Sequence, residues 1–233
     1  EDFAKAVRHI RRRETLRLAL GWLVGEQTLA SISHGLTALN DWYLVSLTKE
    51  ILRQKAPSLD LGIVAMGRFG GSELVFGSDA DVMFVYGEQA KGDSSQKDAE
   101  LVIDSLRTLA KDPQLEFELD LDLRPEGKNG PIARSLDSYA TYYSRWGDVW
   151  ENQALLRARM IYGSKQLVSN FSALVDEYRY PKELPSSSII EIRRIKARVE
   201  AERLPQGADP KRHLKLGRGS LSDIEWLVQL LQL

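Results

Sequence analysis

The sequence predicts an α+β protein in which a small sheet unit lies between two helical segments. Apolar residues recur at helical spacing through residues 3–55 and again from residue 135 onwards. Between these segments, Leu61–Met66 and Val82–Tyr86 are short and almost continuously apolar, which is typical of buried strands. The 233 residues are enough to enclose a sizeable core in one large domain or two small ones.

Residues 1–55 are predicted to form an N-terminal helical segment. Phe3, Val7 and Ile10 lie three or four positions apart, so they share one face of a helix. The basic run Arg11–Arg13 has the composition of a phosphate-binding patch. We interpret it as a solvated helix face, because runs of charge on a helix usually face water.

Residues 56–165 are predicted to contain the sheet. The turn Gly70–Ser72 is expected to open a short helix between the first two strands, and the polar stretch Lys91–Lys97 is expected to form a surface loop. A helix is predicted at 98–110. Apolar and polar residues then alternate through Phe117–Arg124, which is the pattern of a half-buried strand.

Helical spacing returns in residues 135–162, where several of the apolar positions are aromatic. We interpret these rings as helix core rather than as a platform for stacking bases, because aromatic residues at such spacing usually pack internally. Residues 166–233 are predicted to form a further helical segment. The chain starts without Met and stops within an amphipathic run, so we expect it to be a piece of a longer protein.

Composition narrows the class of protein. The 32 basic and 33 acidic side chains give a formal net charge of −1, which argues against a nucleic-acid coat protein or a membrane-surface protein. There is no cysteine, so disulfides and thiolate metal sites are excluded, as is common in cytoplasmic proteins. No apolar run approaches the roughly 20 residues that span a bilayer. We expect a cytoplasmic protein that binds neither nucleic acid nor membrane.

A pair of carboxylates at the start of the second strand indicates a metal site. Asp79 and Asp81 are separated by one residue, so in a strand their side chains lie on the same face. Two such carboxylates and a third from a neighbouring strand can hold two Mg²⁺ ions about 3.5–4 Å apart. Glu118, Asp120 and Asp122 all occupy the polar face of the next predicted strand, and spacing alone does not choose between them.

The Gly-Gly-Ser turn before these carboxylates indicates a phosphate site. Gly70 and Gly71 allow the backbone to approach a phosphate closely, and Arg68 can add a charged hydrogen bond. The turn lacks the Gly-Lys-Ser/Thr ending of a P-loop and the Gly-x-Gly-x-x-Gly of a dinucleotide fold. Together, the turn and the carboxylates suggest an enzyme that transfers a nucleotide.

Four segments also resemble a known family: Gly67–Leu74 with Ser78–Asp81, Leu119–Pro125, Trp150–Arg159 and Leu214–Glu225. In this order they are similar to the motifs of bacterial glutamine synthetase adenylyltransferases. Members of that family have two polymerase-beta-like nucleotidyltransferase halves. One half attaches AMP to a tyrosine of glutamine synthetase, and the other removes it by phosphorolysis. The resemblance therefore implies a polymerase-beta-like unit in residues 56–165.

The resemblance assigns roles to individual residues. Asp79 and Asp81 match the first two metal carboxylates and Asp120 matches the third, so these three are the expected catalytic and metal-binding residues. The expected nucleotide-binding residues lie in and beside the turn: Arg68, Gly70, Gly71, Ser72 and Ser78.

Some positions differ from the family pattern. Asp122 stands where many relatives carry a basic residue, and Arg68 replaces a frequent Lys. Ser220 and Ser222 lie where many relatives read Gly-Gly-Ile-Arg. The segment Trp150–Arg157 is more similar to the C-terminal, adenylylating half than to the removing half.

The function implied is transfer of AMP from ATP to a tyrosine of glutamine synthetase, which would control nitrogen assimilation. Two Mg²⁺ ions are the implied cofactor, and a nitrogen-signalling protein is a possible partner of the full-length enzyme. The removing half, a nucleotidyltransferase acting on RNA or a small molecule, and a non-catalytic nucleotide-binding regulatory domain are the alternatives. Lys215 and Arg218 are candidates for contact with the nucleotide or the protein substrate, or are simply part of a loop.

Overall fold

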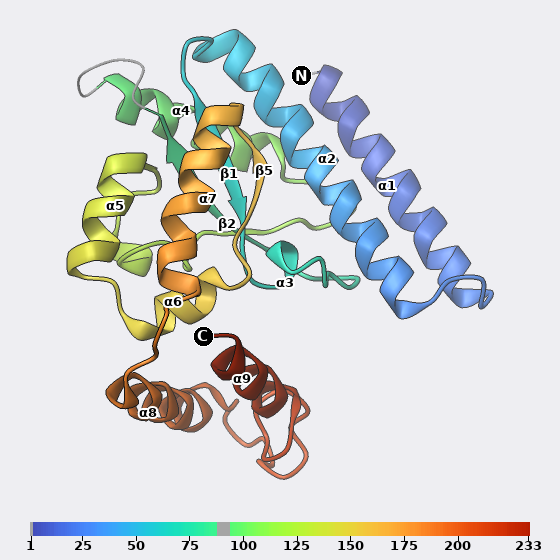
Figure 1. The fold of residues 1–233 in the computed structure, drawn as a ribbon. Coiled ribbons are helices and arrows are strands. Elements are labelled where there is room, and N and C mark those ends of the chain that lie inside the picture. Colours follow the sequence, from blue (N-terminus) through green and yellow to red (C-terminus); the bar gives the residue numbers. More distant parts are fainter. Residues whose placement is uncertain (1, 88–93) are drawn as a thin grey trace. The chain divides into compact units, whose positions relative to one another are not determined.

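The computed structural model describes residues 2–87 and 94–233. The chain divides into two compact units. The first contains the chain up to Tyr142 together with Arg157–Ser172, and the second contains Tyr143–Leu156 and Ala173–Leu233. The fold is mixed α and β with one small open sheet, so the predicted α+β class is confirmed (Figure 1).

The sheet of the first unit has five strands: β1 (Leu61–Ala65), β2 (Ala80–Tyr86), β3 (Leu119–Asp120), β4 (Arg134–Ser135) and β5 (Arg159–Tyr162). Its order is β3-β2-β1-β5, and β4 also pairs with β2. β1 is antiparallel to β2 and β5, whereas β2 is parallel to β3 and β4. β1 and β2 are almost entirely buried, as their continuous apolar sequences predict.

Two long helices form the N-terminal part of this unit. α1 (Asp2–Leu23) lies along α2 (Leu29–Lys55), and the Thr28 side chain caps α2 by accepting a hydrogen bond from the Ser31 amide (Figure 1). Helices are therefore confirmed throughout residues 3–55 apart from the turn between them. The remaining helices of the sheet region are the single-turn α3 (Gly67–Gly70) and α4 (Ser94–Leu109).

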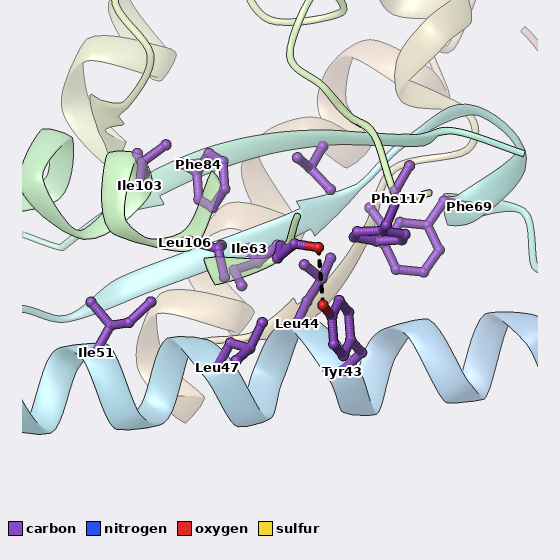
Figure 2. Packing of buried hydrophobic residues seen from close by; sticks show 14 of the residues in the cluster. Tyr43, Leu44, Leu47, Ile51, Ile63, Phe69, Phe84, Ile103, Leu106 and Phe117 are labelled. Atoms are coloured by element: carbon purple, nitrogen blue, oxygen red, sulfur yellow. Dashed lines mark hydrogen bonds between the residues drawn. The ribbon is translucent and has the colours of Figure 1, made fainter. Parts of the chain in front are cut away.

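The core lies between α2, the sheet and α4. Tyr43, Leu44 and Leu47 of α2 point towards Ile63 of β1 and Leu106 of α4 (Figure 2). The Tyr43 ring also meets the edge of Phe117, with the ring centroids 5.3 Å apart. This packing fixes α2 beneath the sheet, and Phe117 brings the start of the β3 segment into the same core.

Several predictions of secondary structure need correction, three of them in the strands and in α4. The strand expected over Phe117–Arg124 is only the two residues of β3, because Arg124 turns inward and donates to the carbonyl oxygens of Leu121 at 2.7 Å and Gly130 at 3.1 Å. Residues 159–162, expected to be helical, form β5 against β1. α4 begins at Ser94 rather than at residue 98.

The polar loop expected at Lys91–Lys97 falls partly outside the described residues, because residues 91–93 are not among them, and its remainder belongs to α4. The three-segment division of the chain at residues 55 and 165 remains a prediction. In the structure, α1 and α2 belong to the same compact unit as the sheet.

The second unit is helical. It contains α6 (Val149–Leu155), α8 (Ser186–Arg203) and α9 (Leu221–Gln232), while α5 (Leu136–Arg145) and α7 (Lys165–Arg179) begin in the first unit and end in the second. α6 packs against α8, and Lys196 of α8 forms ion pairs with Glu200 and with Asp223 of α9. Within residues 2–87 and 94–233, no helix is both long and apolar enough to cross a membrane.

The aromatic residues of the 135–162 segment are only partly helix core. Tyr139 and Tyr143 are buried, and the Tyr139 ring packs edge-on against Phe171 at 5.5 Å. Trp146, by contrast, is 70% exposed. The helical pattern therefore identified the buried tyrosines correctly but not the tryptophan.

Candidate metal and nucleotide site

Three aspartates come together at one end of the sheet. One carboxylate oxygen from each of Asp79, Asp81 and Asp120 lies within 4.8 Å of the other two. Asp79 is exposed, and Asp81 and Asp120 are half-buried. Oxygen atoms of this kind at this separation suit Mg²⁺, which prefers one or two carboxylates and completes its shell with water or phosphate oxygens. The residues present therefore fit the metal that the sequence implies.

The sheet register explains why these side chains meet. β2 and β3 are parallel and pair Asp81 directly with Asp120. The Ala80 amide donates to the Glu118 carbonyl at 2.9 Å, which extends the pairing by one residue. Directly opposed residues of paired strands carry their side chains on the same face of a sheet. Asp79 immediately precedes β2 and adds the third carboxylate.

The structure distinguishes between the three acids that spacing left open. Only Asp120 lies in the cluster with Asp79 and Asp81 among the residues described. The Asp122 carboxylate forms an ion pair with Lys128 at 3.3 Å, and the Asp122 amide donates to Oδ1 of Asp120 at 2.7 Å. Asp122 therefore orients Asp120 through its backbone. Glu118 is exposed and contributes its carbonyl to the strand pairing.

The Gly-Gly-Ser turn differs from its prediction. It follows the short helix α3 instead of opening a helix, and Gly71 is the residue that ends α3. The amides of Gly70, Gly71 and Ser72 donate to the carbonyl oxygens of Met66, Gly67 and Phe69 at 2.7, 3.1 and 3.3 Å. These amides already close the helical turn. A phosphate at this turn would therefore meet side chains rather than open backbone donors.

Two glycines are required by their surroundings. Gly67 has a φ of +51°, and a Cβ there would lie 2.2 Å from Oδ2 of Asp81, so the metal-site carboxylate occupies the space beside it. A Cβ on Gly70 would lie 1.8 Å from the Arg157 carbonyl oxygen and 2.6 Å from that of Ala65. Gly70 is thus needed for close packing of the backbone.

The other expected nucleotide-binding residues lie around this turn. The Arg68 side chain is half-buried and makes no hydrogen bond or ion pair within the described parts of the chain. Ser72 adopts a left-handed conformation with a φ of +59°, which is uncommon for a residue other than glycine. The Ser78 hydroxyl accepts a hydrogen bond from the Val75 amide at 3.1 Å, so it shapes the loop that leads to Asp79.

Sequence reasoning missed the residue that supports the turn. The guanidinium of Arg159 on β5 donates to Asp41 of α2 at 2.8 and 3.1 Å and to the carbonyl oxygens of Phe69 and Gly70 at 3.2 Å each. Neighbouring Arg157 forms an ion pair with Glu73 at 3.1 Å. Both arginines belong to Trp150–Arg159, one of the four segments that resemble the family. That resemblance was the feature of the sequence that could have identified them.

The remaining candidates belong to the second unit. Lys215 and Arg218 are both exposed in the loop before α9. This loop is tightly closed, because a Cβ on Gly217 would lie 2.5 Å from the Pro210 carbonyl oxygen and 2.6 Å from that of His213. The two cations therefore project from an ordered turn.

Comparison with known proteins identifies the family. The family model described as glutamate-ammonia ligase adenylyltransferase matches residues 1–174. Among curated relatives, bifunctional glutamine synthetase adenylyltransferase/adenylyl-removing enzymes are 51% identical in Leifsonia xyli subsp. xyli, over 100% of this chain, and 46% identical in Mycobacterium marinum, over 98%. The corresponding enzyme of Mycobacterium tuberculosis is 44% identical over 97% of this chain. The chain spans only 23–24% of the length of these relatives. The chain belongs to the glutamate-ammonia ligase adenylyltransferase family.

Proposed function

We propose that this chain carries a Mg²⁺-dependent nucleotidyltransferase site that moves AMP from ATP to a tyrosine hydroxyl of glutamine synthetase, with release of pyrophosphate. The observation that carries the proposal is the cluster of Asp79, Asp81 and Asp120 on paired strands. Membership of the family and the printed names of the relatives support the reaction class and the protein substrate.

The three aspartates would hold the metal and set the geometry of transfer. Bound Mg²⁺ neutralises charge on the phosphates and favours in-line displacement at phosphorus. The carboxylates of Asp79 and Asp81 would hold the ion together with that of Asp120. Asp120, whose Oδ1 is held by the Asp122 amide, would lie on the side of the incoming tyrosine oxygen. A free tyrosine has a pKa near ~10, so the hydroxyl needs a base to accept its proton, and the Asp120 carboxylate could serve.

The triphosphate would be bound by side chains beside the turn. Because the amides of Gly70, Gly71 and Ser72 already bond to backbone carbonyls, the Arg68 guanidinium and the Ser72 hydroxyl would bind the phosphate oxygens. A guanidinium binds phosphate through charged, geometrically directed hydrogen bonds. In this proposal Gly70 and Gly71 give the turn its shape, and Ser78 orders the loop before Asp79.

The direction of transfer is part of the proposal. The similarity of Trp150–Arg157 to the adenylylating half supports AMP attachment over AMP removal. The relatives are named for both activities, and this chain covers about a quarter of their length. We further propose that the chain acts in the cytoplasm. A nitrogen-signalling protein would regulate it through the full-length enzyme.

The test incubates this chain with unmodified glutamine synthetase, Mg²⁺ and ATP labelled at the α-phosphate. Label on glutamine synthetase and released pyrophosphate would support the adenylylating direction. A parallel reaction contains AMP-modified glutamine synthetase and phosphate, where formation of ADP would instead identify the removing half. The matched control replaces Asp79 and Asp81 with Asn. A folded double variant that retains full activity would contradict the metal site.

If neither reaction gives its product, the proposal that this chain acts on glutamine synthetase is contradicted. Equilibrium binding of ATP without turnover would then favour the non-catalytic regulatory domain. The two reactions and the binding measurement together therefore separate the adenylylating half, the removing half and the non-catalytic regulatory domain.

A further inference from the structure

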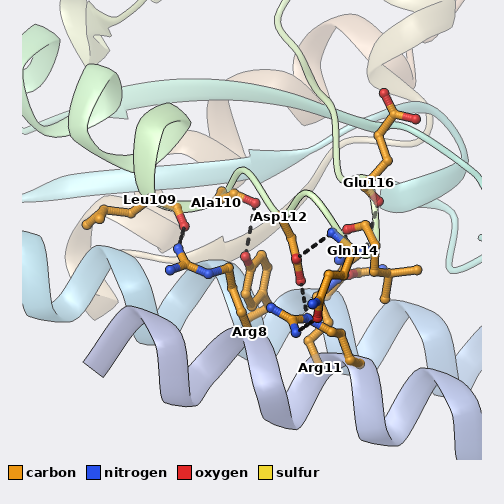
Figure 3. Close-up of polar contacts among 11 residues, drawn as sticks. Arg8, Arg11, Leu109, Ala110, Asp112, Gln114 and Glu116 are labelled. Carbon is orange, nitrogen blue, oxygen red and sulfur yellow. Dashed lines mark hydrogen bonds and ion pairs between the residues drawn. The ribbon is translucent and has the colours of Figure 1, made fainter. Parts of the chain in front are cut away.

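The run Arg11–Arg13 of α1 is not the solvated helix face that the sequence suggests, and Arg8, one turn earlier, is also bonded to a distant segment. Arg8 donates to the Leu109 carbonyl oxygen at 2.8 Å, and Arg12 forms an ion pair with Asp112 at 2.7 Å. Arg11 is only 6% exposed. Arg8 and Arg11 point from α1 towards the end of α4 and the segment that connects it to β3 (Figure 3). Arg12 also bonds to this segment, at Asp112. Arg13 alone follows the prediction, since it is exposed and pairs with its neighbour Glu14.

Arg11 has the most demanding surroundings. Its guanidinium donates to Oδ1 of Asn40 at 3.1 Å and to the carbonyl oxygens of Leu115 and Glu116 at 3.0 and 3.3 Å. It also lies over the rings of Phe117 at 4.6 Å and Tyr43 at 5.2 Å. Burial lowers the pKa of Arg11, because removal from water disfavours its charged form. A buried cation is tolerated only where its donors are satisfied, so these acceptors are closely matched to it.

The backbone held by Arg11 leads directly into the candidate metal site. Glu116 lies four residues before Asp120, and Glu118 between them accepts the hydrogen bond from the Ala80 amide. β3 itself is only two residues long. So short a strand makes too few ladder hydrogen bonds to fix its own position. A slip of one residue would turn Asp120 to the opposite face of the sheet.

The other polar contacts that α1 and α2 make with this segment lie further from Asp120, whereas Phe117 is held by packing in the core. Arg8 bonds to the Leu109 carbonyl at the end of α4, and the Tyr43 hydroxyl bonds to that of Ala110. Arg12 bonds to the side chains of Asp112 and Gln114 in the connection. Arg11 is the α1 residue that holds its end, at Leu115 and Glu116. Helix α1 thus carries both Arg11, which bonds to the chain next to β3, and other arginines that can serve as control positions.

We propose that Arg11 is a positioning residue for Asp120. By binding the Leu115 and Glu116 carbonyl oxygens, it fixes the chain that enters β3 and so places the third carboxylate opposite Asp81. The role in metal binding rests on the proposed function, whereas the role in placing β3 does not.

The first experiment measures amide hydrogen exchange at Ala80 without added metal. Ala80 donates to the Glu118 carbonyl, so its protection reports the docking of β3. The Met66 amide, which donates to the Asp81 carbonyl on the other side of β2, reports the stability of the rest of the sheet. In Arg11→Met, exchange at Ala80 should become faster by a larger factor than exchange at Met66. In Arg8→Met and Arg13→Met, the ratio of the two rates should stay at its unsubstituted value.

The second experiment measures the affinity for Mn²⁺, as a probe of the carboxylate cluster, by electron paramagnetic resonance. Arg11→Met should weaken binding about 10-fold or more, within the 10–100-fold range for residues that orient metal ligands. In an Asp120→Asn background the same substitution should have little further effect, since the ligand it positions is absent. Simple destabilisation would give equal effects in both backgrounds.

If Arg11→Met does not fold, Arg11→Lys is measured instead, because Lys retains the charge but lacks the planar set of donors. Equal acceleration at Ala80 and Met66, or none at Ala80, in either folded variant would overturn the proposal. Absence of Mn²⁺ binding by the unsubstituted chain would overturn the proposed function. The exchange ratio would still decide whether Arg11 positions β3.

Discussion

Two arginines hold opposite flanks of the carboxylate cluster, and they do so differently. Arg159 holds the turn after α3 and Arg11 holds the segment before β3. Each binds two backbone carbonyl oxygens and lies over a phenylalanine ring. Their remaining partners are consecutive residues of α2. Arg159 pairs with the carboxylate of Asp41, whereas Arg11 has only the neutral amide of Asn40.

The two arginines are stabilised in different ways, Arg159 by an ion pair and Arg11 by the directions of its hydrogen bonds. Arg159 is partly exposed and its charge is balanced by a direct ion pair. Arg11 is buried and satisfied by neutral acceptors in fixed directions. Loss of Arg159 would leave the Asp41 carboxylate without its ion-pair partner. Loss of Arg11 would leave neutral hydrogen-bond acceptors unsatisfied, while the nearby Asp112 carboxylate would keep its ion pair with Arg12. We therefore expect the turn to depend on charge balance and β3 to depend on the exact directions of donors.

The largest expected effect concerns the turn, where Gly70→Ala should destabilise the fold by about 3 kcal/mol or more. The added methyl group would meet the carbonyl oxygens of Arg157 and Ala65, and backbone atoms cannot move aside independently. Urea unfolding gives the free energy. Gly71→Ala is the control, because the nearest atom to its added Cβ would belong to the flexible Glu73 side chain, at an ordinary contact distance of 3.4 Å. Equal stability of the two variants would contradict this account of the packing.

The next effect tests charge balance directly. Arg159→Met should lower the free energy of unfolding by about 2 kcal/mol, a value reduced from that of a fully buried pair because both partners are partly exposed. Asp41→Asn in the same background should restore about 1 kcal/mol by removing the unpaired carboxylate. If the double variant is no more stable than Arg159→Met, charge balance is not what distinguishes the two flanks.

A smaller effect, dependent on pH, is expected at the Arg12–Asp112 pair. Burial of Asp112 disfavours its ionised form, but hydrogen bonds from Arg12 and the Gln114 amide outweigh this and lower its pKa. The ionised group therefore stabilises the fold above the unfolded pKa near ~4 and loses this effect as the pH falls through the lower folded value. Asp112→Asn should cost about 1.5 kcal/mol at pH 7.

Urea unfolding of both proteins at pH 7 and at about pH 3 checks this prediction. The difference between them should shrink on acidification. A difference that stays constant over this range would mean that the pair contributes through shape rather than charge.

The smallest expected effect is at Ser72. Its left-handed backbone costs roughly 1 kcal/mol, which glycine would relieve, but glycine also makes the unfolded chain more flexible by a similar amount. Ser72→Gly should therefore change the free energy of unfolding by less than about 0.5 kcal/mol. Ser72→Val, which resists this conformation, should be clearly less stable. A Val variant as stable as the Gly variant would show that the turn adapts.

The sequence predicted those parts of the fold that depend on local patterns. β1 and β2 follow from continuous apolar runs, and alternation places Asp79 and Asp81 on one face of a strand. Alternation left Glu118, Asp120 and Asp122 open, and only the family resemblance singled out Asp120, which the structure brings to the other two. β3 was predicted too long, because the inward turn of Arg124 depends on carbonyl oxygens that no periodicity reveals. Apolar and polar residues alternate up to Arg124, but the strand ends at Asp120.

The burial of Arg11 could not have been predicted from its neighbours. A run of three arginines looks like a solvated face, and the carbonyl acceptors that make burial possible lie about a hundred residues further along the chain. The role of Arg159 could not be predicted for the same reason, because its partners on α2 and in the turn are also distant in the sequence. Local pattern thus predicts which residues carry the chemistry, while distant acceptors determine which residues support it.

The parallel pairing of β2 with β3 also bears on how the site arises during synthesis. Asp79 and Asp81 leave the ribosome well before Asp120, which follows only after α4 and its connection. Pairing β3 with β2 requires closure of this long loop, whose entropic cost precedes any gain from the contacts. The full set of carboxylates therefore exists only once that loop has closed. A nascent chain that ends before residue 120 holds two of its acids but not the third.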